Sequence, residues 1–403
     1  MTDLDSLYRD LHSHPELPFE EHRTAGIVAE RMRELGLEVE EGFGGTGVAA
    51  VLRNGDGPTV WLRADMDGLP VEEKTGLDYA STVVFTAADG TRIPVMHACG
   101  HDMHVTWLVG AVEELVASSA DWSGTVVALF QPAEELLAGA KAMADDPRFG
   151  DLPRPSIVLG QHVGPLPAGV VSLTAGAAMA GVDDLAVVLH GQGGHGSRPE
   201  TTTDPVLAAA AAVVRLQSVV AREVTPGQLA VVTVGSLRAG TKSNVIPDEA
   251  RLGINIRTVD PRTRERVLGA VTRIITAEAT ASGMTEAPTI DIALSGPPTV
   301  NSPEHTATLR QKFAAAWGAP AVIDYGTVSG SEDVGLLASA AEAPLVFWIT
   351  GGADPAAVTA AMAAGRFEQD IPSNHSPYYA PVLHPTIERG VDALVIAART
   401  FLS

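Results

Sequence analysis

The sequence contains one cysteine in 403 residues, no long hydrophobic run and no excess of basic side chains. A single thiol excludes an internal disulfide framework and favours a reducing compartment. The first residues, MTDLDSLYRDLHSHPE, have no basic start and no apolar segment, so no secretory signal is visible. No apolar run approaches the roughly 18–20 residues that cross a bilayer. These absences predict a cytoplasmic protein without a membrane anchor.

The formal net charge is −22. A surface of that sign repels phosphate backbones and anionic lipid headgroups, which argues against nucleic-acid and membrane partners. The composition, 45% hydrophobic and 19% charged, is that of a globular protein, and the length is enough for two hydrophobic cores. The acidity by itself says nothing about catalysis.

Hydrophobic patterns in the first third alternate between the helical and the strand period. Helices are predicted at 3–11, 20–35 and 103–118, and strands at 47–52, 59–64, 125–130 and 156–160. This alternation predicts the α/β class, with a layered domain around a mostly parallel sheet. Residues from about 182 follow the order strand, helix, strand, strand, helix, strand, which is typical of a small antiparallel α+β (ferredoxin-like) domain.

The helix–strand alternation resumes after about residue 296, so the α+β domain is predicted to be an insertion. The expected boundaries are 1–178 for the first part of the catalytic domain, 179–295 for the insert and 296–403 for the second part. Loops that carry carboxylate or histidine side chains follow three predicted strands: RADMDG, QPAEE and GQHVG. Open α/β sheets place their sites beyond the carboxyl ends of strands, so these loops predict a functional site.

The only cysteine lies in MHACGHDMH, residues 96–104, together with three of the twelve histidines. Cys99 and His101 are two residues apart, and in an extended segment both side chains would point the same way. Thiolate and imidazole are good ligands for zinc and similar divalent metals, and a helix beginning near Asp102 would favour the thiolate. The alternative is a core cysteine beside surface histidines. For His97 and His104, a structural role and an orienting role stay equally open.

Other candidate ligands follow the later strands. Glu134 and Glu135 can divide the work at a strand end, one binding metal and the other taking a proton from a metal-bound water. His162, in GQHVG, and His375, in PSNHSPYYAP, are further candidates, although a lone loop histidine is often without function.

The motifs resemble, in order and over nearly the whole chain, the hippurate hydrolase and indole-acetyl-amino-acid hydrolase-like branch of the aminoacylase (carboxypeptidase G/desuccinylase) metallopeptidase superfamily. The motifs that carry this resemblance are RADMDGLP, MHACGHDMH, QPAEE, GQHVGPLPAG, GGHGSRPE, SNVIPDEARLGINIRT, SGSEDVG and NHSP. The resemblance implies a metal-dependent amidohydrolase that cleaves N-acyl-L-amino acids into a carboxylic acid and a free amino acid. It also implies that the insert is a lid and dimerisation domain and that the protein is a homodimer, or a tetramer.

The resemblance assigns roles to eleven residues. Its implied ligands for two divalent ions (zinc, manganese, cobalt or nickel) are Cys99, shared by both ions, and His101, Glu135, His162 and His375. Glu134 matches the general base that activates a metal-bound water, and His195 matches a donor to the oxyanion. Asn244 and Arg257 match residues that bind the substrate carboxylate. Asp65 and Asp67 occupy the place of an HxD motif, and we expect them to support ligands rather than bind metal.

Three alternatives remain open from the sequence. One is a metal-free amidase in which Cys99 attacks the substrate directly, which would leave the glutamates and the later histidines without a role. Another is a non-catalytic protein with a structural zinc site. The third is a dipeptidase or N-carbamoyl-amino-acid hydrolase of the same superfamily, because a fold does not fix the substrate.

Overall fold

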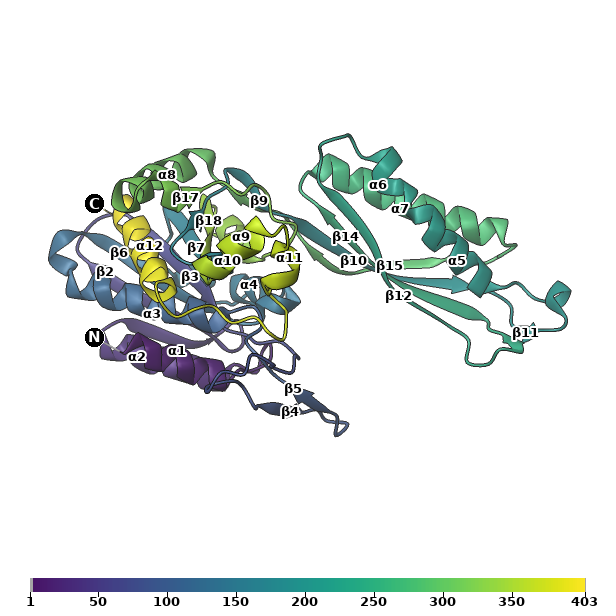
Figure 1. The fold of residues 1–403 in the computed structure, drawn as a ribbon, viewed down its shortest axis with the longest axis horizontal. Helices are drawn as coiled ribbons and strands as arrows, with labels where there is room; N and C mark the ends of the chain where they lie inside the picture. The colour runs from purple at the N-terminus through teal and green to yellow at the C-terminus, as the bar shows by residue number, and fades with distance from the viewer. Residues whose placement is uncertain (1–2, 403) are drawn as a thin grey trace. The chain divides into compact units, whose positions relative to one another are not determined.

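A computed structural model describes residues 3–402 and divides the chain into two units, each with its own sheet (Figure 1). The first unit comprises the chain up to Ala178, then Val300–Gly326, then the chain from Asp333 onward. The second unit comprises Met179–Thr299 and Thr327–Glu332. Each unit has a separate core of buried aliphatic and aromatic side chains.

An eight-stranded sheet forms the centre of the first unit. Its strands, in sheet order, are β1 (Glu38–Phe43), β2 (Gly47–Asn54), β6 (Gly124–Gln131), β3 (Thr59–Asp65), β7 (Ile157–Pro167), β18 (Leu345–Ala353), β8 (Val171–Ser172) and β17 (Val322–Ile323). The four strands from β6 to β18 are mutually parallel, and antiparallel pairs lie on either side of them. Every residue of β6 is buried, as expected for a strand covered on both faces. The predicted α/β class with a mostly parallel sheet is confirmed.

Helices cover both faces of this sheet. They are α1 (Leu4–Ser13), α2 (His22–Glu34), α3 (His101–Ala117), α4 (Gly139–Ala144), α8 (Pro303–Trp317), α9 (Val334–Ala340), α10 (Pro355–Ala363), α11 (Phe367–Asp370) and α12 (Thr386–Phe401). α3 and α12 pack together against β3 and β7, and Leu62 of β3 joins their core. The next residue, Arg63, points to the other face and reaches Asp333 just before α9.

The strand predicted at 156–160 is longer than the sequence pattern indicates. β7 pairs with β18 without interruption as far as Gly164 and again at Pro167, and His162 lies opposite Ile349 within this pairing. The expectation of a loop at His162 was therefore wrong. The glycine that follows this histidine in the pairing fits closely against β18, because a Cβ atom on Gly164 would lie 2.7 Å from the side chain of Ile349.

The second unit is a four-stranded antiparallel sheet with helices packed against it. Its strands, in sheet order, are β12 (Ala230–Ala239), β14 (Glu249–Thr258), β10 (Gly181–His190) and β15 (Thr289–Gly296). The helices are α5 (Pro205–Leu216), α6 (Ser218–Glu223) and α7 (Pro261–Ala281). This order is that of the predicted ferredoxin-like arrangement, in which the first and third strands of the motif lie side by side at the centre.

Short strands complete the fold: β4 (Val84–Thr86) pairs with β5 (Arg92–Pro94), β11 (Gly194–His195) with β13 (Val245–Ile246), and β9 (Gly176–Met179) with β16 (Thr299–Asn301). Within residues 3–402, none of the helices combines the length and the apolar character needed to span a bilayer.

Candidate metal centre

The site lies where the parallel strands of the first unit end. β3 ends at Asp65, β6 ends at Gln131, and α3 begins at His101. Cys99 and His101 do not belong to an extended segment, so that part of the prediction was wrong. The chain turns at Gly100, which has a φ of 85° and a position where a Cβ atom would lie 2.4 Å from the side chain of Val163. Glycine permits this turn, and the turn brings the thiol and the imidazole together.

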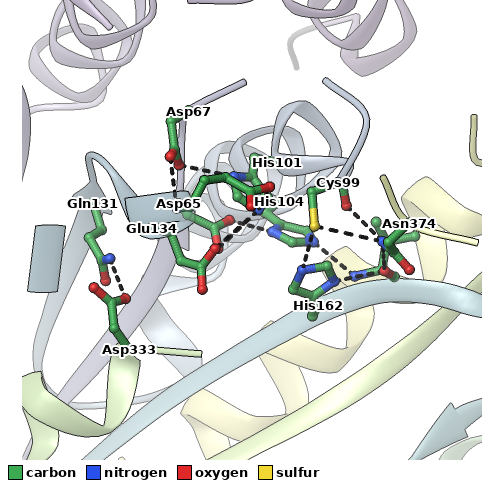
Figure 2. A network of polar contacts seen from close by, with 12 residues as sticks. Asp65, Asp67, Cys99, His101, His104, Gln131, Glu134, His162, Asp333 and Asn374 are labelled. Carbon is green, nitrogen blue, oxygen red and sulfur yellow. Dashed lines mark hydrogen bonds and ion pairs between the residues drawn. The ribbon is translucent and has the colours of Figure 1, made fainter. Parts of the chain in front are cut away.

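The structure gathers the five predicted ligands and the predicted base in one cluster of the first unit. Figure 2 shows four of these six residues: Cys99, His101, His162 and Glu134. Three overlapping groups, each with ligand atoms within 4.8 Å of one another, make up this cluster: Cys99, His101 and His162; Cys99, Glu135 and His375; and His101, Glu134 and Glu135. The Nε2 atom of His162 lies 3.4 Å from the Cys99 sulfur. The Nε2 atom of His375 lies 3.4 Å from a Glu135 oxygen.

Asp67 fixes the orientation of two members of the cluster. Its Oδ1 atom accepts a hydrogen bond from Nδ1 of His101 at 3.1 Å, and its Oδ2 atom accepts one from the Glu135 backbone amide at 3.0 Å. With the proton on Nδ1, the Nε2 atom of His101 is left to face the cluster. This is the carboxylate–histidine arrangement that orients metal ligands in proteins.

Asp65 acts one step further away, through His104. The carboxylate of Asp65 accepts a hydrogen bond from Nδ1 of His104, and Nε2 of His104 accepts the Val163 backbone amide at 2.8 Å. Nδ1 of His162 in turn donates to the Val163 carbonyl oxygen at 2.7 Å, which turns Nε2 of His162 toward the thiol. Asp65 and His104 thus hold the strand segment that presents His162.

The loop that carries His375 is attached to the cysteine turn. The His375 amide donates to the Ala98 carbonyl at 2.8 Å, and the Asn374 side chain donates to the Cys99 carbonyl at 3.0 Å (Figure 2). His375 has a φ of 70° and a side chain that is 56% exposed. Asn374 was not among the predicted site residues, although its place directly before His375 in NHSP could have suggested it.

The electrostatics of the cluster favour a cation. Burial opposes a charged imidazole, but Asp65, Asp67 and Glu135 outweigh it and raise the pKa of His101 to about 10. Burial likewise opposes ionisation of Asp65, yet Arg63, His101 and His104 hold its pKa well below the usual value. Burial, with Glu135 and Glu134, raises the pKa of the Cys99 thiol. Protons are therefore retained at positions where a bound metal would replace them.

Two polar atoms of the cluster point to a bound ion. Nε2 of His101 and Oε1 of Glu135 are buried and have no hydrogen-bond partner among the described residues. Buried polar atoms are nearly always paired, so these two fit a bound ion. Together with sulfur, imidazole and carboxylate donors, they form a set suited to divalent transition metals. His97 is also buried, and neither of its ring nitrogens has a hydrogen-bond partner among the described residues. Burial lowers the pKa of His97 to about 4.

The three other predicted residues belong to the second unit, so the cluster does not contain them. His195 is exposed on β11, where its Nδ1 atom accepts the Ser197 amide at 3.1 Å, leaving the ring proton on Nε2. Asn244 lies beside it, with its carbonyl accepting the Gly196 amide at 2.9 Å. Half-buried Arg257 donates to Ser331 at 2.7 Å, and burial lowers its pKa.

Sequence reasoning missed the buried residues that support the site. Arg63, which is 1% exposed, donates to Asp65 at 2.7 Å and to Gln131 at 2.8 Å. Gln131 donates in turn to Asp333 at 2.6 Å (Figure 2). Arg63, Gln131 and Asp333 lie inside the motifs RADMDG, QPAEE and SGSEDVG. Their position in these motifs was the signal that could have indicated a role at the site.

Comparison with known proteins shows the family of the chain. The profile of "Peptidase family M20/M25/M40" matches residues 61–371. A thermostable carboxypeptidase of Saccharolobus solfataricus is 37% identical over 81% of this chain and 80% of its own. A hippurate hydrolase of Campylobacter jejuni is 41% identical over 65% of this chain and 66% of its own. An N-acetylcysteine deacetylase of Bacillus subtilis is 39% identical over 70% of this chain and 71% of its own.

Among solved structures, a dinuclear metal-binding peptidase of family M20 from Bacillus subtilis has a TM-score of 0.75, with 29% identity over 98% of this chain and 96% of its own. The fold and the cluster define a metal-dependent hydrolase of amide bonds. The chain belongs to peptidase family M20/M25/M40.

Proposed function

We propose that this protein hydrolyses N-acyl-L-amino acids to a carboxylic acid and a free amino acid. The observation that carries the proposal is the convergence of Cys99, His101, Glu135, His162 and His375 around one point, with Glu134 beside them. Relatives named for hippurate and for N-acetylcysteine support this substrate class, since both compounds are N-acyl amino acids. Two divalent ions, of zinc, manganese, cobalt or nickel, would be held by the five ligands.

When bound, the ions supply Lewis-acid activation of the water and of the amide carbonyl. Glu134, whose side chain is 7% exposed, takes the proton of the attacking water and delivers it to the leaving nitrogen. This second transfer is necessary because an amine anion is a very poor leaving group. Asp67 keeps the His101 imidazole oriented while the proton moves, and Asp65 acts through His104 on the segment that presents His162.

In this proposal the second unit binds the rest of the substrate. Nε2–H of His195 donates to the developing oxyanion, a role in which one donor contributes about 10²–10³-fold in rate. Asn244 and Arg257 bind the free carboxylate, for which a guanidinium offers two parallel donors. The second unit would also be the dimerisation domain of a cytoplasmic homodimer, with His195 completing the partner's site.

The experiment is a panel of N-acetyl-, N-benzoyl-, indole-acetyl- and long-chain acyl-amino acids, with dipeptides and N-carbamoyl-amino acids alongside. Apoprotein prepared with EDTA is reloaded separately with each of the four metals. We expect hydrolysis of N-acyl-L-amino acids that disappears in EDTA and returns with metal. Turnover that persists in EDTA would instead support direct attack by Cys99. Tight binding of a single ion without turnover of any substrate would support a structural metal site.

A further inference from the structure

The turn after β6 carries both Glu134 and Glu135, and buried carboxylates from elsewhere hold its backbone. Oε1 of Glu21 accepts the Ala133 amide at 2.8 Å. Asp67 accepts the Glu135 amide at 3.0 Å. The backbone amides on either side of Glu134 are therefore each bound by a carboxylate, and the two carboxylates come from separate parts of the chain.

This turn depends on such contacts because its backbone is strained. Ala133 has a φ of 47° and Leu137 has a φ of 49°, both in the left-handed region. Residues other than glycine occupy that region at a cost and stay there only when the surroundings impose it. Asp333 adds a third contact, by accepting the Ala140 amide at 3.0 Å just beyond the turn.

Glu21 is kept free for this contact by another residue. It occupies the N-cap position of α2, yet its side chain makes no capping hydrogen bond. Glu16 caps the helix instead, accepting the amides of Arg23 at 2.7 Å and Thr24 at 2.8 Å. The second oxygen of Glu21 accepts the hydroxyl of Thr46, and the residue is 0% exposed. Both of its oxygens are therefore engaged away from its own helix.

We propose that Glu21 is a positioning residue for the general base: by accepting the Ala133 amide it fixes the turn that aims Glu134 into the cluster. The inference rests on the function proposed above for Glu134. Asp67 supports the ligand side of the turn, at Glu135, whereas Glu21 supports the side that leads into the base. Loss of the Glu21 contact should consequently affect proton transfer more than metal retention.

Two conservative variants of Glu21 separate the reach of its hydrogen-bond acceptor from the chemical type of that acceptor. Glu21→Gln keeps an oxygen at the same reach for the Ala133 amide, and its NH2 group can face Thr46. Glu21→Asp keeps the carboxyl group but withdraws its oxygens by one methylene. We expect Glu21→Gln to retain kcat within about three-fold. We expect Glu21→Asp to lose roughly 10–100-fold in kcat, with KM and metal content near wild type, because small misplacements of a catalytic group are this costly.

Hydrogen exchange of the peptide spanning residues 131–140 gives a readout that does not depend on activity. Exchange in this peptide should be faster in Glu21→Asp than in wild type and unchanged in Glu21→Gln. Asp183→Asn is the control, since Asp183 is a carboxylate of the second unit that is 1% exposed and accepts hydrogen bonds from Arg264 at 2.7 Å. That control should leave both kcat and exchange in the 131–140 peptide unchanged.

Equal behaviour of the two Glu21 variants, or a greater loss in Glu21→Gln, would overturn the inference. So would unchanged exchange in Glu21→Asp. If wild type hydrolyses no N-acyl-amino acid but the exchange difference appears, the proposed function fails while the structural role of Glu21 stands. The two failures are thus distinguishable.

Discussion

Two regions that the proposed reaction requires are built in different ways. In the first unit, the proposed ligands and base gather near the ends of the parallel strands, all of them except His375 largely buried, and the buried Asp67 and Asp65 hold His101 and His104 in place. In the second unit, His195 is exposed, and its ring is held mainly by its own turn through Ser197. Substitutions in the first region should therefore abolish the catalytic step, whereas substitutions in the second should weaken contacts with the substrate.

Glu134→Gln should have the largest effect and would test the first half of this comparison. Without a carboxylate to accept the proton of water, kcat should fall by about 10²–10⁴-fold. Because Glu134 is not among the five ligands, metal content measured by plasma mass spectrometry should stay at the wild-type level. Retained turnover in the variant would mean that another group is the base.

Mixing two inactive variants would sharpen the comparison by asking which subunit supplies each region. His195→Ala alone should lose about 10²–10³-fold in kcat, the usual effect of removing one oxyanion donor. If His195 serves the partner's site, refolding Glu134→Gln with His195→Ala creates hybrid dimers with one complete site. Activity should then rise to roughly a quarter of wild type. Activity that stays at the level of the two parents would place His195 in its own subunit's site.

Arg257→Lys should show a smaller effect, confined to binding. Lysine keeps the positive charge but loses the planar pair of donors, so KM should rise by about 10-fold, the equivalent of ~1.4 kcal/mol. We expect kcat to change by less than about three-fold, because the carboxylate takes no part in the bond that breaks. A loss in kcat with an unchanged KM would contradict the assigned role. Steady-state kinetics on the best substrate of the panel separates the two outcomes.

The smallest effect concerns stability, and it contrasts a buried with an exposed histidine. Burial disfavours a charged His12, but Asp102 at 2.6 Å and Glu73 at 3.1 Å outweigh it and raise its pKa from 6.5 to about 9. Since the folded-state pKa is the higher one, the interaction stabilises fully below pH 6.5 and is lost as the pH rises through about 9. Its contribution is on the order of a few kcal/mol.

Thermal melting between pH 6 and pH 10 measures this effect. The Tm of wild type should fall over the upper part of the range, and His12→Asn should have a lower Tm that varies less with pH. His384→Asn is the control, because His384 also lies between two carboxylates, Asp5 and Glu388, but its side chain is 56% exposed. An identical pH dependence in wild type and His12→Asn would refute the interpretation.

The sequence was sufficient for the fold class because hydrophobic periodicity and strand–helix alternation are local signals. The helix predicted at 103–118 is α3, which spans His101–Ala117. The strand through His162 was underestimated because its continuation depends on pairing with β18, a segment nearly 190 residues away in sequence. Local patterns do not contain that information.

The cluster was predictable because its proposed ligands lie in sequence motifs. The buried residues that hold the cluster in place were not predictable. Glu21 meets Ala133 only in the folded chain, and no local pattern around Glu21 indicates that contact. Arg63 and Asp333 were overlooked for a related reason, since a buried ion-pair partner cannot be told from a surface charge in the sequence alone.

The most direct test of the account is anomalous diffraction from crystals grown with manganese. The account predicts two anomalous peaks in the first unit, both at bonding distance from the sulfur of Cys99, with His101, His162, Glu135 and His375 completing the coordination and Glu134 bound to neither ion. A single peak with Glu134 as a ligand, or no peak near Cys99, would contradict it.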